Sequence, residues 1–264
     1  MEKMSLSEII RNPDLTLPAS DAEYERILNN RPWQDPREGV NCEICRNYEY
    51  TWVIRDGDRL YHTCECKAKR DNLKRIRESG LSEQMKRCTF EAFETPNKWQ
   101  KDAKTHVIQF VRDKNRGWLL LSGQPGCGKS HLCTAAAGKF LGAGIETQYM
   151  RWVDESTSLK AIVNDEEAYS RKINKLKNCK VLYIDDFLKT QKGKEPTPAD
   201  VKLAFDLLDY RYCKRKMVTI ISTERSIDEL LEIDPAVGSR IYEMSKGYRL
   251  VFEYSEDKDW RLKD

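Results

Sequence analysis

The stretch GQPGCGKS, residues 123–130, decides the fold of this chain. It fits the pattern G-x-x-x-x-G-K-[ST] at every fixed position, and it lies between the strand-like run WLLL at 118–121 and a helical stretch. The glycines allow successive backbone N–H groups to point at phosphate oxygens, and the start of a helix adds its positive dipole end. The pattern therefore predicts an ATP phosphate-binding loop; a glycine-rich turn without a ligand is the alternative.

A second motif, the apolar run VLYI at 181–184, ends in Asp185 and Asp186 and has the form of a Walker B strand. We expect Asp185 to hold Mg²⁺ through water and Asp186 to orient or deprotonate the attacking water. Lys129 is expected to reach the β- and γ-phosphates, and the Ser130 hydroxyl to ligate Mg²⁺. The alternative is a buried strand that happens to end in acidic turn residues. The residues expected to contact ATP are Gly123, Pro125, Gly126, Cys127, Gly128, Lys129, Ser130, His131 and Asp185.

Apolar runs alternate with amphipathic helical stretches from about residue 90 onward, which is typical of an α/β domain. Strands are predicted at 118–122, 146–150, 181–185, 218–222 and 249–254. Helices are predicted at 98–114, 129–140, 168–177, 198–214, 227–231 and 238–244. Further short helical patterns lie around residues 6–10 and 24–28, and a charged one at 67–79 ends at Gly80. We predict two domains, 1–80 and 81–264.

Four of the nine cysteines form two close pairs, Cys42-x-x-Cys45 and Cys64-x-Cys66. Such pairs can close a tetrahedral thiolate site for zinc while the residues between them form a hairpin, here with a turn near 56–58. The segment has little apolar material, so a metal would supply much of its folding energy. We predict one zinc module at about 40–68. His62 is the rival fourth ligand, and four reduced cysteines without metal are the remaining alternative.

The composition favours a cytoplasmic protein without a membrane partner. The chain has 264 residues, of which 34% are charged and 39% hydrophobic, and its longest apolar runs are too short to span a bilayer. The start of the chain lacks the layout of a signal peptide. A net charge of +3 does not by itself indicate a nucleic-acid partner. Basic residues do gather at 67–77 and 211–216, either as solvated helix faces or as contact surfaces.

Three further stretches, together with the phosphate loop, carry a family resemblance. GKSHL at 128–132, TIISTE at 219–224 followed by IDELL at 227–231, and GSRIYEM at 238–244 resemble the ATPase domain of DnaC/DnaI-type helicase loaders, in the DnaA/DnaC branch of the AAA+ proteins. The resemblance covers about residues 90–254. It implies an α/β fold with a parallel five-stranded sheet flanked by helices. Only a short charged stretch follows residue 254, so no C-terminal helical lid is expected.

The resemblance also implies an activity. Proteins of this type are ATPases that place a DnaB-type hexameric replicative helicase on single-stranded DNA, and they associate with copies of themselves through the ATP site. In DnaI-type loaders an N-terminal zinc module contacts the helicase. Two rival functions stay open: an IstB-type helper of a transposase, against which the zinc motif argues, and a zinc-dependent adaptor whose ATP site never turns over.

Particular residues acquire roles only through this resemblance. Arg240 matches the arginine that reaches a neighbouring subunit's γ-phosphate, although an ordinary surface arginine is the alternative. Glu224 stands where the family has an asparagine that senses the γ-phosphate, so Thr223 or Ser222 is expected to replace it. Asp186 is one methylene shorter than the usual glutamate, which suggests slow, switch-like hydrolysis. Candidate contacts to single-stranded DNA are Lys189, Lys192 and Lys194 with Phe187 nearby, or else this segment is a surface loop without DNA.

Overall fold

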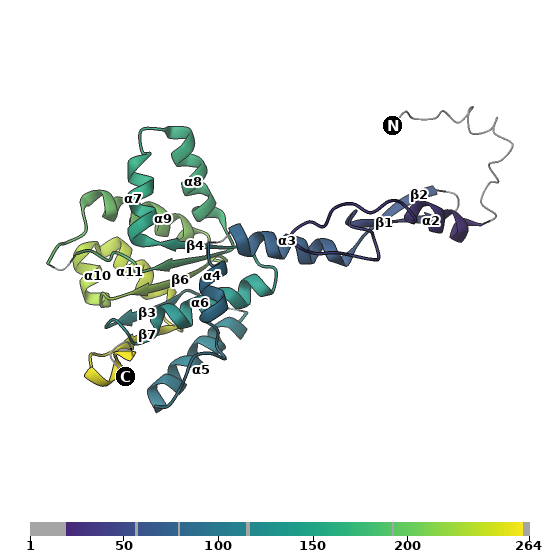
Figure 1. Ribbon diagram of the computed structural model, residues 1–264. Helices are drawn as coiled ribbons and strands as arrows, with labels where there is room; N and C mark the ends of the chain where they lie inside the picture. Colours follow the sequence, from purple (N-terminus) through teal and green to yellow (C-terminus); the bar gives the residue numbers. More distant parts are fainter. Residues whose placement is uncertain (1–19, 56–57, 79, 115–116, 192, 261–264) are drawn as a thin grey trace. The chain divides into compact units, whose positions relative to one another are not determined.

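The chain folds into two compact units, Met1–Leu73 and Lys74–Asp264, in a computed structural model that describes residues 20–55, 58–78, 80–114, 117–191 and 193–260 (Figure 1). The boundary falls inside helix α3 (Glu65–Glu78). The predicted helical pattern around residues 6–10 lies outside the described residues. Among the described residues, no helix combines the length and apolarity needed to cross a bilayer.

The first unit is built on an antiparallel hairpin. Strands β1 (Tyr50–Arg55) and β2 (Asp58–Thr63) pair in register from Tyr50 opposite Thr63 to Arg55 opposite Asp58. Helix α2 (Asp21–Asn29) begins after the Ser20 cap, whose side chain accepts from the Glu23 N–H. The predicted hairpin between the cysteine pairs is confirmed, while the first two residues of its predicted turn, 56 and 57, are not described.

Side chains from helix α2 cover the outer edge of β1. The Trp52 N–H donates to Asn29 Oδ1 at 2.8 Å, and Asn29 Nδ2 donates back to the Trp52 carbonyl at 2.9 Å. The Ile54 N–H donates to Glu25 Oε1 at 2.6 Å. These bonds satisfy backbone groups that an edge strand normally leaves open. On the other side of the hairpin, β2 pairs with β1 alone in the described structure, and all six of its residues are exposed.

The second unit contains a parallel sheet with the strand order β4-β5-β6-β3-β7. Its strands are β3 (Leu119–Gly123), β4 (Thr147–Arg151), β5 (Val181–Asp185), β6 (Val218–Thr223) and β7 (Arg249–Phe252). The predicted parallel five-stranded sheet is confirmed, and each strand lies within two residues of its predicted bounds. After β7, residues 253–260 contain only a one-turn 3-10 helix, Glu256–Lys258, and no lid helix.

Helices cover both faces of this sheet and make it a three-layer domain (Figure 1). Helices α4, α5 and α6 pack in one hydrophobic cluster, and α7 to α11 pack in the other. The strands feed both clusters alternately: Leu119 and Leu121 lie in the first, Trp118 and Leu120 in the second. The bounds of the helices in the two clusters are α4 (Ser82–Arg87), α5 (Lys98–Arg112), α6 (Lys129–Gly142), α7 (Trp152–Ala161), α8 (Glu166–Asn178), α9 (Pro198–Cys213), α10 (Ile227–Ile233) and α11 (Pro235–Met244).

Two arginines from the predicted basic clusters are buried and structural. Arg211 is fully buried and donates to the carbonyls of Leu176, Cys179 and Val218 at 2.7–3.1 Å. Arg70, 2% exposed, lies against the cysteine segment of the first unit. Reading these two positions as solvated helix faces was therefore wrong, because each guanidinium satisfies buried carbonyl groups that would otherwise lack partners.

Candidate ATP site and cysteine cluster

The predicted phosphate loop connects β3 to helix α6 at the carboxyl edge of the sheet. Gly128 caps the helix with φ +89°, and a Cβ there would lie 2.6 Å from Cε2 of Phe93. The left-handed conformation and the close ring both require glycine. The first amides of α6 therefore face the hollow above the strands, where the helix end favours an anion.

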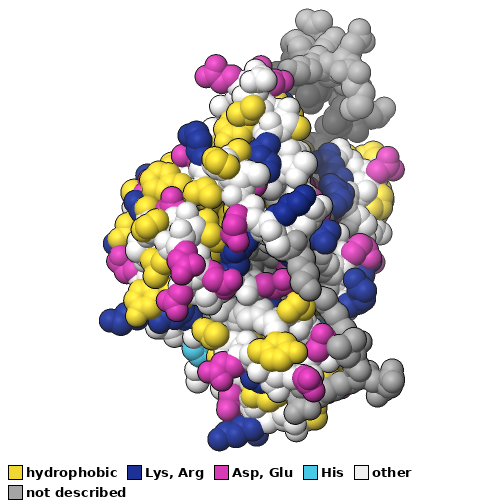
Figure 2. All heavy atoms as spheres, turned by 90° about the vertical axis from the view of Figure 1, so that its left-hand side faces the viewer, with side chains coloured by type: hydrophobic (Ala, Val, Ile, Leu, Met, Phe, Trp, Pro, Cys, Tyr) yellow, Lys and Arg dark blue, Asp and Glu magenta, His cyan; other side chains and the backbone are white. Residues whose placement is uncertain are grey.

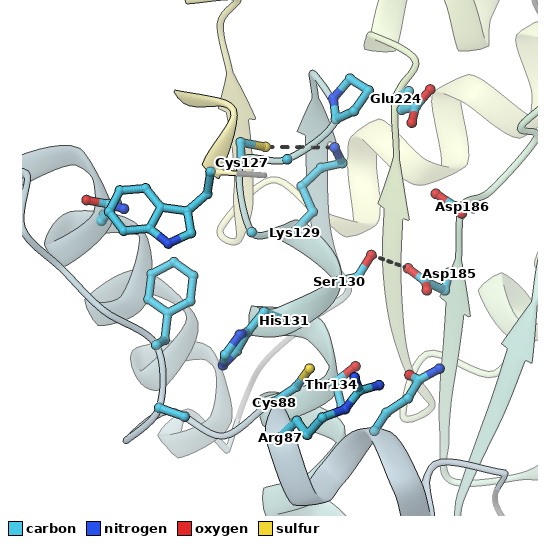
Figure 3. Close-up of a pocket in the computed structure, with 18 of the residues that line it drawn as sticks. Arg87, Cys88, Cys127, Lys129, Ser130, His131, Thr134, Asp185, Asp186 and Glu224 are labelled. Atoms are coloured by element: carbon cyan, nitrogen blue, oxygen red, sulfur yellow. Dashed lines mark hydrogen bonds between the residues drawn. The ribbon is translucent and has the colours of Figure 1, made fainter. Parts of the chain in front are cut away.

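Lys129 lies within the curve of this loop. Its Nζ donates to the carbonyls of Gly123 at 2.8 Å and Gln124 at 2.7 Å, and the residue is 7% exposed. A dashed line in Figure 3 also joins it to the Cys127 sulfur, at 3.8 Å. The loop thus concentrates one ammonium and several amide N–H groups in a small volume, which suits a polyphosphate.

Asp185 is the centre of a hydrogen-bond cluster at the end of β5. Its Oδ1 accepts from Ser130 Oγ at 2.8 Å, from the Tyr183 hydroxyl at 2.8 Å, and from the Ser222 hydroxyl. Its Oδ2 accepts from the Tyr149 hydroxyl at 3.2 Å. The two residues predicted to hold Mg²⁺, Ser130 and Asp185, are thus in direct contact (Figure 3).

The two tyrosines stay protonated at neutral pH. Burial, strengthened by the neighbouring Asp185 carboxylate, raises the pKa of Tyr149 to about 12 and that of Tyr183 well above its usual range. Both phenols therefore donate O–H groups to the carboxylate and fix its orientation toward Ser130.

Asp186 follows in a left-handed conformation, φ +55°, with its N–H donating to Ser222 Oγ at 3.2 Å. Its carboxylate meets Lys189, whose Nζ lies 3.4 Å from Asp186 Oδ1 and 2.8 Å from Glu224 Oε1. Burial alone would lower the pKa of Lys189, but the two carboxylates outweigh it and the pKa is raised. The predicted water-activating acid is therefore ion-paired with a lysine that sequence reasoning had not placed in the site.

These groups line one cavity of about 600 Å³, a size usual for small-molecule sites. Lys189 and Glu224 lie in its wall, together with Phe93, Trp99 and Trp260. The predicted residues that line it are Pro125, Gly126, Cys127, Gly128, Lys129, Ser130, His131, Asp185 and Asp186. Gly123 contributes its carbonyl to Lys129 and is not in the wall.

Two predicted catalytic residues lie elsewhere. Thr223 is fully buried, and its hydroxyl donates to the Phe187 carbonyl at 2.8 Å, which argues against a role as γ-phosphate sensor. Arg240 lies on α11 outside the wall of the cavity, with Nη2 2.7 Å from Asp209 Oδ1. It does not reach the site of its own subunit in this arrangement, so a role toward a neighbouring subunit stays a prediction beside the alternative of an ordinary surface arginine.

The residues predicted to contact single-stranded DNA differ in their surroundings. Lys189 is engaged in the cavity, and Phe187 is fully buried, with its ring centroid 5.0 Å from that of Trp152. The buried Phe187 ring is not available to a DNA strand, which argues against that assignment, whereas the Lys189 side chain is 36% exposed and its contact with DNA stays a prediction. Lys194 is exposed, whereas Lys192 is not described. On the face drawn in Figure 2, both basic and acidic side chains are spread over the surface.

The four paired cysteines come together in the first unit. The sulfur atoms of Cys42, Cys45, Cys64 and Cys66 all lie within 4.8 Å of one another, with Cys42–Cys64 at 3.7 Å and Cys45–Cys66 at 3.4 Å. A tetrahedral zinc with Zn–S bonds of about 2.3 Å holds its sulfurs about 3.8 Å apart, so this set fits zinc. His62 is exposed on β2 and is not part of the cluster, so the structure favours the four-cysteine set.

A second layer of bonds orients this cluster. The Glu49 N–H donates to Cys45 Sγ at 3.3 Å, and the Cys42 N–H donates to Oδ1 of the buried Asn47 at 2.9 Å. The same Asn47 oxygen accepts from Arg70 at 2.7 Å. Burial would raise the pKa of the Cys42 thiol, but hydrogen bonds with the other three cysteines outweigh this and lower it to about 7. Burial raises the pKa of the Cys64 and Cys66 thiols, so without metal the thiolate form is favoured at Cys42 and opposed at these two residues.

Comparison with known families and proteins agrees with this geometry. The family model for the IstB-like ATP binding protein matches residues 57–234. The chain is 31% identical over 238 residues to the phage-like element PBSX protein XkdC of Bacillus subtilis (strain 168), which covers 86% of this chain and 88% of that protein.

At lower sequence identity, the chain is similar to proteins of DNA replication. The replicative helicase loader DnaC of Escherichia coli (strain K12) is 24% identical over 166 residues, covering 62% of this chain and 64% of that protein. The crystal structure of the DnaC helicase loader superposes with a TM-score of 0.55 at 22% identity, over 66% of this chain and 99% of that chain, which shows a shared fold. By its family match and its similarity to XkdC, this chain belongs to the family of IstB-like ATP binding proteins.

Proposed function

We propose that this chain is an ATP-hydrolysing switch that loads a DnaB-type hexameric replicative helicase onto single-stranded DNA. The observation that carries the proposal is the convergence of Lys129, Ser130, Asp185 and Asp186 in one cavity, on a fold shared with DnaC. The similarity to a protein named as a replicative helicase loader supports the choice of reaction. The cysteine cluster supports it over a transposase helper, because a separate metal module offers a second docking element for a helicase.

The roles within the site follow from the contacts. Lys129 and the loop amides would grip the β- and γ-phosphates, and Ser130 with Asp185 would hold Mg²⁺. When bound, Mg²⁺ supplies positive charge that offsets the negative charge on the transferred phosphoryl group. Asp186 can orient water only after its ion pair with Lys189 breaks. The freed Lys189 ammonium can then pair with the γ-phosphate. This coupling suits slow hydrolysis.

Arg240 is proposed to act on the ATP of a neighbouring subunit. Its ion pair with Asp209 is partly exposed, with side chains 24% and 34% exposed. Such pairs contribute about 1 kcal/mol or less, so a neighbour's phosphate can displace Asp209 at little cost. A guanidinium also presents a fixed fork of donors to phosphate oxygens.

We expect Arg240→Ala and Asp186→Asn each to lower the hydrolysis rate, by roughly 10³-fold for the arginine and at least about 10²-fold for the acid. An equimolar mixture of the two variants should recover up to about a quarter of the wild-type rate, because intact sites then meet intact arginines. Steady-state phosphate release measures this, with the exposed Arg171→Ala as a matched control. A mixture no faster than either variant would mean that Arg240 does not act across subunits.

The function itself is tested with purified helicase. We expect the chain to co-purify with a DnaB-type helicase and, with Mg·ATP, to start unwinding of a forked DNA coated with single-strand binding protein. Loading should be lost in the variant Lys129→Ala. Binding to a transposase and not to helicase would favour the IstB-type helper. Helicase binding without any ATP turnover, with or without single-stranded DNA, would favour the adaptor.

A further inference from the structure

The segment that follows β7 is fastened to the phosphate loop at two positions. Gln124 and Ser255 exchange a pair of hydrogen bonds: Ser255 N–H donates to Gln124 Oε1 at 2.6 Å, and Gln124 Nε2 donates to the Ser255 carbonyl at 2.9 Å. Two loop residues later, the Gly126 carbonyl accepts from the Trp260 N–H at 3.1 Å. Residues 255–260 therefore lie along the loop and are hydrogen-bonded to it at both ends of this segment.

The fit between segment and loop is close. Gly126 has φ +78°, and a Cβ at this position would lie 1.8 Å from Oδ1 of Asp259. A side chain here would force the Asp259 carboxyl group to move, and φ +78° itself favours glycine, so glycine suits both the contact and the turn. This close approach distinguishes a built contact from a chain end that merely lies nearby.

The contact brings Trp260 into the wall of the ATP cavity, where the residue is 37% exposed and so keeps surface that a ligand can cover. Different segments supply different parts of the cavity wall. Asp185, Asp186, Lys189 and Glu224 lie at or just after the ends of β5 and β6, whereas Phe93, Trp99 and Trp260 come from the segment before α5, from α5 and from the segment after β7. Glu94, next to Phe93, and Tyr149 on β4 also line the cavity. Figure 3 shows Asp186 and Glu224 on one side of the start of α6 and His131 on the other, and the Phe93 ring lies 5.2 Å from that of His131.

A triphosphate gripped by the loop has its γ-phosphate toward Asp185 and Asp186, so its ribose and base must leave the loop away from these acids. The aromatic part of the wall is what they meet there. An indole suits a purine because both present flat π-surfaces, and base–aromatic stacking strengthens binding roughly tenfold.

We propose that Trp260 contacts the base of bound ATP, and that residues Ser255–Trp260 form the outer wall of the base site. This inference rests on the proposed ATP site. It assigns a base-binding residue to a segment that lies 131 positions from the loop in the chain, counted between Gln124 and Ser255.

The test compares two ligands that share the phosphate tail. Titration calorimetry with Mg·ATP and with Mg·tripolyphosphate is carried out on wild type, Trp260→Ala and Trp260→Phe. We expect Trp260→Ala to weaken ATP binding roughly tenfold and to leave tripolyphosphate binding unchanged, because the inorganic ligand has no base to stack. Trp260→Phe keeps a flat ring and should retain most of the affinity for ATP.

Each other result decides against the inference. Unchanged ATP affinity in Trp260→Ala would exclude a base contact, and an equal loss for both ligands would mean that Trp260 only shapes the loop. Wild type that binds neither ligand would overturn the proposed ATP site itself, which is a different failure.

If Trp260→Ala does not fold, Trp260→Phe decides through fluorescence. Energy transfer from tryptophan to bound N-methylanthraniloyl-ATP should fall in Trp260→Phe relative to wild type, because the tryptophan nearest the proposed base site is then removed. Transfer at the wild-type level in Trp260→Phe would contradict the proposal.

Discussion

Replacement of Lys129 by alanine is expected to abolish ATP turnover and to weaken Mg·ATP binding severely. Lys129 provides the ammonium inside the curve of the loop, where it donates to two loop carbonyls and is nearly buried. Loss of one preorganised charge of this kind lowers a rate by on the order of 10²–10³-fold. Phosphate release and calorimetry with Mg·ATP measure the two effects.

The matched control for this variant is Lys139→Ala. Lys139 lies on the same helix, α6, but its Nζ pairs with Glu91 at the surface, 3.2 Å away, and lies outside the cavity wall. Its removal should leave binding and turnover at wild-type values. A Lys129→Ala protein that still folds, binds Mg·ATP and hydrolyses it normally would overturn the assignment of the loop.

Removal of zinc is expected to unfold the hairpin of the first unit while the second unit keeps its ATP site. The small core of the first unit is formed by Val40 and the cysteine cluster, so little apolar burial would remain without metal. Structural zinc sites of this kind contribute apparent binding free energies of about 10–16 kcal/mol. Cys45→Ser should lower the zinc content from about one per chain to near zero and expose the amides of β1 and β2 to hydrogen exchange.

Cys213→Ser is the control, because Cys213 is an exposed cysteine at the end of α9, outside the cluster. It should keep both its zinc and its protected hairpin. Chelator-treated protein without zinc but with the amides of β1 and β2 still protected would refute a structural metal.

The inner strands of the sheet were predictable because they are buried on both faces. β5 reads VLYID and is buried at every position, so an uninterrupted apolar run marks it. Helix α7 was missed for the opposite reason. It begins at Trp152, directly after β4, without a break, and its buried residues, Trp152, Ser156 and Leu159, form too sparse a pattern to reveal a helical face.

The site was predictable where local spacing defines it and not where distant segments meet. The loop and Asp185 were identified from short motifs. Alternation along β6 places Ser222 and Thr223 on opposite faces, but only the structure shows that Ser222 is the one that faces Asp185. The bridge from Lys189 to Glu224 and the bond from Trp260 to Gly126 join residues far apart in the chain, and no periodicity signals such contacts.

The covered edge of β1 has a consequence for how this protein can associate. A β-sheet can extend through many copies of a protein only if each copy has two unpaired edge strands, so that it pairs with one copy on each side. Asn29 and Glu25 close one of them, which leaves β2 as the single open edge of the hairpin. Pairing through the described hairpin can therefore join one β2 to another β2 and then stops, so this hairpin does not support the growth of a continuous sheet.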